Sequence, residues 1–339
     1  MAVRQRREID LGAPQALEAR AVVIGRVTPN LVDPEIVDQL AAFQFPPLTV
    51  DGLAASRQER EAMFLAALDV PTTVESVDHV VDEARGVVVR VHREPGASGP
   101  LPCLFSIHGG GYVMGTRLMD DPMHRAYCGS LGIVGASVEY RLSPETPYPG
   151  PLEDCYDGLA WVMANAADLG IDPDRVGIYG GSAGGGLAAG LALLVRDRDE
   201  FDIAFQTLIC PMLDDRQITP SSQLEGLDIW SRDSNEFGWR AYLGPRYADP
   251  ALPIYAAPAR AKDLSRLPPA YIAVGTIDGF RDEDVDYATR LNQAGVPCEL
   301  HVYPGGPHGY QMFPFTEMSQ QSALDVTRWL RRQLARLQP

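Results

Sequence analysis

The sequence predicts an α/β protein in which a mostly parallel, eight-stranded sheet has helices on both faces and carries a helical cap. From Leu101 onward, short apolar segments alternate with longer segments whose apolar residues recur at helical intervals. The run LPCLFSI (101–107) is continuously apolar, as expected for a strand that is buried on both faces of a parallel sheet. A chain of 339 residues is also long enough for one large core with an appended segment.

Taken in order, the elements divide the chain into a helical start and an α/β domain. Residues 1–72 should form N-terminal helices that belong to the cap, because IVDQLAAF (36–43) and ASRQEREAMFLAAL (55–68) carry apolar residues at helical spacing. The domain over 73–339 follows. Its strands are expected at 74–81, 86–94, 101–107, 132–140, 174–180, 202–212, 268–276 and 297–305. Its helices are expected at 152–170, 183–198, 283–295 and 322–337.

A segment at about 213–250 interrupts this alternation and is too long to be an ordinary loop. We interpret it as a cap insertion that joins the N-terminal helices. Its aromatic residues are candidates for lining a small-molecule pocket, and packing inside the cap is the competing explanation. The candidates are Trp230, Phe237, Trp239 and Tyr242, together with Tyr112 outside the insertion.

The charge of the chain limits its partners. It has 29 Lys and Arg against 45 Asp and Glu, a formal net charge of −16, which repels phosphate backbones and anionic lipids. We therefore expect neither a nucleic acid nor a membrane as a partner. The sequence has no bilayer-spanning run and no signal-peptide pattern, and its five cysteines include no CxxC pair. These observations favour a cytoplasmic protein without a metal site, acting on a small molecule.

The strongest local motif is GGSAG (180–184), which fits G-x-S-x-G between a strand and a helix. A sharp turn there lifts the Ser182 hydroxyl above the sheet, and the flanking glycines remove clashes with Cβ atoms. The amino end of the next helix favours negative charge beside the serine. A turn without chemistry is the competing explanation. The dinucleotide-like string that starts at Gly184 lies inside the helix, where it cannot form a phosphate-binding turn.

The second motif is HGGG (108–111), directly after the strand 101–107. Attack on an ester carbonyl places negative charge on oxygen, and fixed N–H donors must stabilise that charge. Consecutive glycines allow the backbone to turn its amides toward the oxygen. We therefore assign the amides of Gly109, Gly110 and Ala183 to an oxyanion hole, with His108 and Gly111 supporting the loop. A dinucleotide site here would require the spacing G-x-G-x-x-G, which the loop lacks.

A general base should follow the serine in the chain, and His301 and His308 are available. His301 lies within a predicted strand, whereas His308 lies in the loop after it and can lean over the serine. Asp278 ends the preceding strand and could orient the imidazole, with Asp282 as the alternative acid. The order Ser182, Asp278, His308 is that of the α/β-hydrolase fold.

Several segments together are similar to the hormone-sensitive-lipase-like family of bacterial esterases. They are HGGGY (108–112), YRLSPE (140–145), GGSAGGGLAA (180–189), DGFRDE (278–283) and PHGY (307–310). The resemblance covers about residues 75–330 and implies no metal, no cofactor, a lid and possible homodimers. Members usually read GDSAGG where this chain has Gly181, a difference that concerns local polarity and not the triad. The segments VEYRLSPET and SAGGGLAAG are most similar to the heroin-esterase branch, which implies hydrolysis of small acyl groups from bulky alcohols.

The motifs together predict a carboxylester hydrolase that acts on short-to-medium acyl esters through an acyl-enzyme. The expected site comprises the triad Ser182, Asp278 and His308 and an oxyanion hole made by the HGGG loop. Two alternatives stay open. An amidase or peptidase would use the same machinery, since this triad serves all acyl transfer. A ligand-binding pseudohydrolase would use the same scaffold without catalysis.

Overall fold

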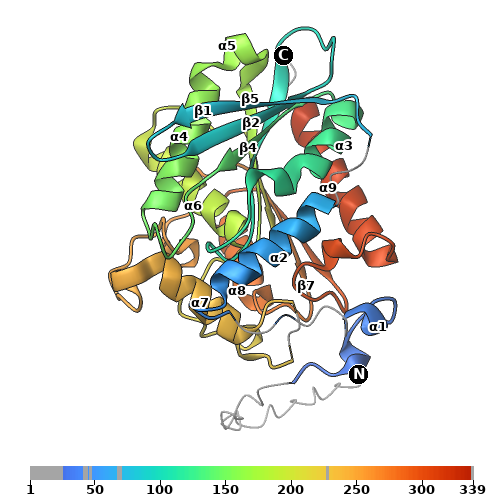
Figure 1. Ribbon diagram of the computed structural model, residues 1–339, viewed down its shortest axis with the longest axis vertical. Coiled ribbons are helices and arrows are strands. Elements are labelled where there is room, and N and C mark those ends of the chain that lie inside the picture. Colours follow the sequence, from blue (N-terminus) through green and yellow to red (C-terminus); the bar gives the residue numbers. More distant parts are fainter. Residues whose placement is uncertain (1–25, 41–44, 46–47, 67–70, 227–228, 337–339) are drawn as a thin grey trace, which may run out of the picture.

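A single eight-stranded sheet organises the molecule (Figure 1), whose computed structural model describes residues 26–40, 45, 48–66, 71–226 and 229–336. The strands are β1 (Glu75–Asp82), β2 (Val87–Arg93), β3 (Leu101–Ile107), β4 (Val134–Glu139), β5 (Ile171–Gly181), β6 (Gln206–Ile209), β7 (Ala270–Gly275) and β8 (Cys298–Tyr303). They are ordered β1-β2-β4-β3-β5-β6-β7-β8. The pairs β1–β2 and β2–β4 are antiparallel, and every later pair is parallel. The predicted sheet is therefore confirmed.

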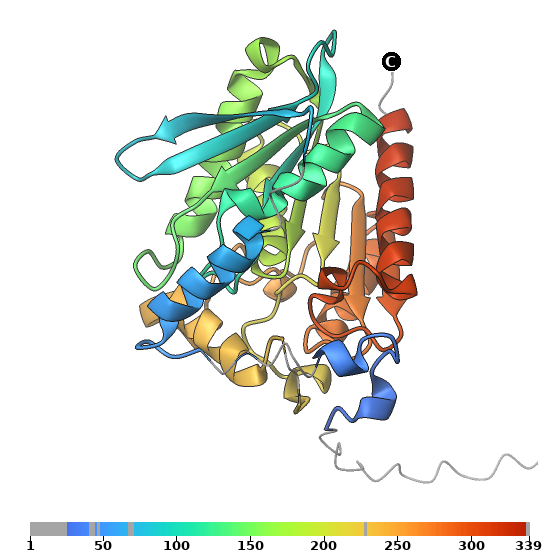
Figure 2. The ribbon, with the colours of Figure 1, turned by 45° about the vertical axis from the view of Figure 1, so that its right-hand side comes forward.

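Helices cover both faces of the sheet (Figures 1 and 2). They are α1 (Val37–Leu40), α2 (Leu53–Ala66), α3 (Asp121–Leu131), α4 (Gly150–Ala164), α5 (Ala166–Leu169), α6 (Ala183–Arg198), α7 (Arg232–Leu243), α8 (Arg281–Gln293) and α9 (Glu317–Arg336). Alternating residues of β3 enter two cores: Phe105 packs in the core that contains α4 and α6, and Leu104 packs in the core that contains α9. Burial on both faces explains why the sequence of β3 is continuously apolar.

Three elements differ from the sequence prediction. The expected helix 152–170 is divided into α4 and α5 at Asn165, whose side chain donates to the carbonyl of Trp161 (2.8 Å). The expected strand 202–212 shortens to β6, because Cys210 has a φ of 39° and Pro211 has no N–H to donate to a ladder. Helix α3 was not predicted. The first two differences come from a side-chain hydrogen bond and a local backbone conformation, which hydrophobic periodicity does not indicate.

Helices α2 and α7 lie at the end of the sheet to which the arrowheads of the central strands point (Figure 2). Arg57 fixes α2 there: its Nη1 and Nη2 donate to the two carboxylate oxygens of Glu145 (2.7 and 2.8 Å), and its Nε donates to the carbonyl of Val113 (2.6 Å). We propose that α2 and the segment 213–250 form the cap. Part of the predicted N-terminal cap, residues 1–25, 41–44, 46–47 and 67–70, lies outside the described residues.

Replacing Arg57 by Ala is expected to raise KM about fivefold for a small ester and to change kcat less. The reason is that α2 forms part of the cavity wall described below, whereas the reacting groups lie on other elements. Steady-state kinetics with a soluble aryl ester measure both constants. Gln58→Ala, an exposed position on the same helix, is the matched control and should leave KM unchanged. An unchanged KM in the Arg57 variant would show that this contact does not hold the wall in place.

Candidate active site

Ser182 lies at the sharp turn between β5 and α6. Its backbone has φ 56° and ψ −123°, a strained conformation for a residue with a side chain. The Ser182 amide donates to the carbonyl of Ile209 (2.8 Å), which ties the turn to the neighbouring strand. A Cβ at Gly184 would lie 2.0 Å from the carbonyl oxygen of Ile107, so no side chain fits there. Close backbone approach is the physical reason for the glycine two residues after the serine.

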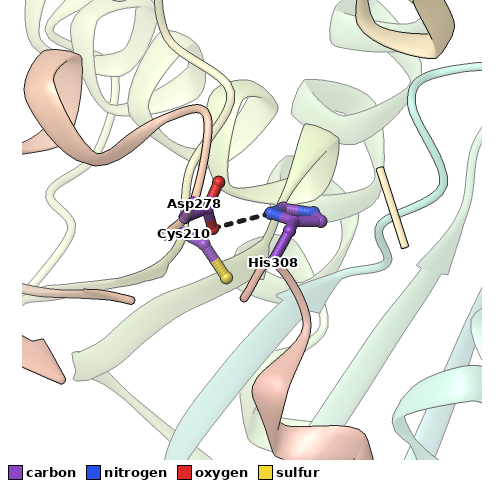
Figure 3. Close-up of side chains that lie close together, drawn as sticks. All are labelled: Cys210, Asp278 and His308. Atoms are coloured by element: carbon purple, nitrogen blue, oxygen red, sulfur yellow. Dashed lines mark hydrogen bonds and ion pairs between the residues drawn. The ribbon is translucent and has the colours of Figure 1, made fainter. Parts of the chain in front are cut away.

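The structure brings Ser182, His308 and Asp278 together from three separate parts of the chain. Nε2 of His308 lies 2.9 Å from Oγ of Ser182, and Nδ1 of His308 lies 2.8 Å from Oδ2 of Asp278 (Figure 3). The other oxygen of Asp278 accepts a hydrogen bond from the amide of Phe280 (2.9 Å). Asp278 and His308 are both buried, whereas Ser182 is half-buried. The serine hydroxyl is thus the accessible end of a buried chain of hydrogen bonds.

These contacts determine the protonation state of His308. An ionised Asp278 can only accept, so Nδ1 carries the proton and Nε2 is free to accept the proton of Ser182. Burial alone would lower the pKa of His308, but the charge and hydrogen bond of Asp278, together with Cys210, raise it above the ordinary histidine value. The Asp278 carboxylate therefore stabilises the imidazolium that a proton transfer from Ser182 would create.

The loop after β3 presents backbone amides beside Ser182. Among the described residues, no carbonyl accepts a hydrogen bond from the amide of Gly109, Gly110 or Ala183. Within the described residues His108 makes no hydrogen bond to the Ser182 hydroxyl: its Nδ1 donates to the carbonyl of Gly109 (2.9 Å), and its ring stacks on Tyr140 at 4.2 Å. Unpaired amides in a water-poor site can stabilise an oxyanion.

Gly110→Ala is expected to lower kcat about 10²- to 10³-fold, the usual cost of losing one oxyanion donor. Gly110 has φ 117°, and a Cβ there would lie 2.2 Å from the carbonyl oxygen of Met114, so the loop must move. The control is Gly96→Ala, which has a similarly positive φ of 76° but no atom within 4 Å of the new Cβ. Equal activity losses in the two variants would contradict a role for Gly110 beyond general backbone strain.

A cavity of about 260 Å³ opens in front of Ser182 and His308. Of the five aromatic candidates, only Trp230 lines it, with its ring over Gly111. The other four occupy different positions. Tyr112 and Tyr242 are buried and stack on each other at 4.1 Å, Trp239 is buried beside them, and Phe237 packs against the same core. For these four residues the structure favours packing inside the core, the competing explanation, over a place in the cavity wall.

The two competing residues from the sequence lie away from the reacting groups. Nε2 of His301 contacts Glu299 (2.9 Å), and Asp282 accepts a hydrogen bond from the amide of Ser221 (2.7 Å). No hydrogen bond or ion pair links either residue to His308 or Ser182 within the described part of the chain.

Sequence reasoning missed two residues of the site, Cys210 and Asp120. Sγ of Cys210 lies within 4.8 Å of donor atoms of Asp278 and His308 (Figure 3), and both missed residues line the cavity. Cys210, Asp278 and His308 are also the one group of metal-donor side chains found among the described residues. A metal bound there would have to displace the Nδ1 proton that His308 donates to Asp278, so we assign the group no metal. Cys210 lies inside the predicted strand 202–212, near its carboxyl end, and a position at the end of a parallel strand was the available signal.

Comparison with known proteins gives consistent results. Residues 104–312 match a protein family described as alpha/beta hydrolase fold. Carboxylesterase NlhH of Mycobacterium tuberculosis is 34% identical over 290 residues, which are 83% of this chain and 89% of that protein. The solved structure of a bacterial heroin esterase is 39% identical with a TM-score of 0.86, covering 91% of this chain and 99% of that one. Esterase LipW from Mycobacterium marinum has a TM-score of 0.72 at 32% identity, covering 93% and 98%.

The comparisons agree with the resemblance drawn from the motifs. Among the described residues, no helix is both long enough and apolar enough to cross a membrane.

Proposed function

The chain belongs to the alpha/beta hydrolase family, among its hormone-sensitive-lipase-like esterases, and from that premise we propose that it hydrolyses carboxylic esters with Ser182 as nucleophile. The observation that carries the proposal is the continuous hydrogen-bonded chain from the Ser182 hydroxyl through His308 to Asp278. Its distances are those at which a base can take up a nucleophile's proton.

In the acylation half of the reaction, Oγ of Ser182 attacks the ester carbonyl carbon while its proton passes to Nε2 of His308. The carbonyl oxygen becomes an oxyanion, which accepts hydrogen bonds from the amides of Gly109, Gly110 and Ala183. As the tetrahedral intermediate collapses, the bond to the alcohol oxygen breaks. The alcohol takes the proton from His308 and leaves the acyl group on Ser182.

In the deacylation half, water replaces the alcohol. It gives a proton to Nε2 of His308 as it attacks the acyl carbon, and the same amides hold the new oxyanion. Collapse breaks the bond to Ser182, whose oxygen recovers the proton from His308. Asp278 keeps the imidazole in the tautomer that both halves require.

We propose short-to-medium acyl esters as substrates, including acetyl esters of bulky alcohols. The size of the cavity, about 260 Å³, supports this class, since it suits a small group better than a long chain. Apolar side chains make up much of the wall: Leu65, Met114, Leu118, Met119, Ile229 and Met312. The similarity to a bacterial heroin esterase supports a bulky alcohol.

A panel of aryl esters of rising acyl length tests the proposal. Turnover should be greatest for short acyl chains and should fall for long ones. A serine-directed phosphonate should abolish turnover and label Ser182, as mass spectrometry of the peptide would show. Anilides matched to the best esters separate an esterase from an amidase. Labelling at another serine, or faster turnover of anilides than of esters, would overturn the proposal.

A further inference from the structure

Asp120 places a carboxylate in the wall of the cavity, and the proposed reaction does not use it. It is the residue before α3 and occupies the N-cap position, yet its side chain makes no capping hydrogen bond. Aspartate at an N-cap usually accepts a hydrogen bond from an amide in the first turn of the helix. Capping therefore does not explain where this side chain lies.

The Asp120 carboxylate has one hydrogen-bond partner and no cation beside it. Oγ of Ser106 donates to its Oδ2 (2.7 Å), and within the described residues its Oδ1 accepts no hydrogen bond and no basic side chain pairs with it. The neighbouring Asp121 differs, because Arg90 and Arg125 both form ion pairs with it. The charge of Asp121 is thus balanced inside the protein, whereas that of Asp120 is not.

The groups that fix the position of the Asp120 carboxylate are neutral. Ser106 is fully buried, and its Oγ lies 2.8 Å from Nε2 of His124. The hydroxyl of Ser106 has a single hydrogen, which goes to Asp120, so Nε2 of His124 must be the donor in the second contact. Burial lowers the pKa of His124 well below its ordinary value, so this ring is neutral and adds no positive charge. These contacts therefore fix the position of the Asp120 carboxylate but do not neutralise its charge.

The described residues of the cavity wall supply little positive charge to balance Asp120. Burial raises the pKa of Asp120 to about 6, so its carboxyl group is mostly ionised above neutral pH. Burial also raises the pKa of Tyr179 in the same wall, with the charges of Tyr127 and Asp120 adding to the rise. Among the described residues that line the cavity, Arg60 is the only Lys or Arg, and its guanidinium lies over the Phe45 ring at 4.1 Å. A carboxylate in a largely apolar cavity is stabilised by a bound cation.

We propose that Asp120 makes this cavity selective for esters that carry a protonated amine, whose N–H donates to the free carboxylate oxygen. This inference rests on the proposed esterase function and deepens it by naming the substrate class. The ammonium could belong to the alcohol or to the acyl part of the ester, and two arms of the experiment distinguish these sources.

In the first arm, dimethylaminopropyl acetate is compared with its carbon isostere, in which CH replaces the nitrogen. The second arm compares the methyl ester of dimethylaminobutyric acid with that of its carbon isostere. At about pH 8 the amines are protonated and Asp120 is ionised. The wild type should favour the amine over the isostere about tenfold in kcat/KM in at least one arm, and the arm that shows the preference identifies the part that binds. Asp120→Asn should remove this preference, so that each amine and its isostere are hydrolysed with similar kcat/KM.

Glu61→Gln is the matched control, because Glu61 is the other acid of the cavity wall and is exposed at its rim. It should keep the preference. Equal ratios in the wild type and Asp120→Asn, or an equal loss in Glu61→Gln, would overturn the proposal. Failure to hydrolyse any of the neutral isosteres would contradict the esterase function instead. Calorimetry on the wild type tests the site without catalysis or variants: a dimethylalkylamine should bind about tenfold more tightly than its carbon isostere, and equal binding overturns the proposal.

Discussion

Ser182→Ala is expected to lower kcat by about four to six decades without unfolding the protein. The variant loses the oxygen that attacks the carbonyl, whereas the oxyanion amides and the cavity remain and supply the residual rate. The side chain of Ser182 has His308 as its hydrogen-bond partner, and its backbone hydrogen bonds do not involve Oγ. The fold should therefore survive the change, with a melting temperature close to that of the wild type.

Single-turnover and steady-state assays with an activated aryl ester measure this loss, and circular dichroism checks the fold. Ser130→Ala is a suitable control, because Ser130 is exposed on α3 and its hydroxyl donates only to the carbonyl of Ala126 (2.7 Å). This control should keep full activity and full phosphonate labelling. If the Ser182 variant kept even a tenth of the wild-type kcat, the nucleophile would have to be another residue.

Asp278→Asn is expected to lower kcat by about four decades and to move the acidic limb of the pH profile to lower pH. An asparagine amide can donate to Nδ1 of His308, which leaves the proton on Nε2, where it blocks proton transfer from Ser182. The negative charge of Asp278 determines the direction in which the acidic limb moves. Asp278 raises the pKa of His308, so its removal disfavours the imidazolium and lowers that pKa. Because the reaction needs neutral His308, kcat/KM rises with pH, and in the variant it should begin to rise at lower pH.

The pH dependence of kcat/KM separates this effect from a general loss of structure, which would lower the rate without moving the limb. Asp282→Asn is the matched control, since Asp282 was the alternative acid and instead accepts a hydrogen bond from Ser221. Its kcat should stay within about threefold of the wild type. The opposite result, with the large loss in the Asp282 variant, would transfer the orienting role to that residue.

Features that depend on nearby residues could be predicted from the sequence alone. The strands β3 and β7 followed from continuous apolar runs, because strands buried on both faces need apolar residues at every position. The turn at Ser182 followed from its glycines, since close backbone approach excludes Cβ atoms there. The order of Ser182, Asp278 and His308 along the chain also indicated which strand ends should meet.

Only the tertiary structure decided which side chains face the cavity. Trp230 lines it whereas Trp239 and Tyr242 do not, although all three are buried and belong to the same aromatic segment. The direction of such a side chain depends on the packing of distant elements. The spacing of residues within one segment does not predict that packing. The same reason applies to Asp120, whose carboxylate is held at the cavity by a hydrogen bond from Ser106 of β3. Short sequence motifs indicate the reacting groups, but the shape and charge of a binding site arise from contacts between remote segments.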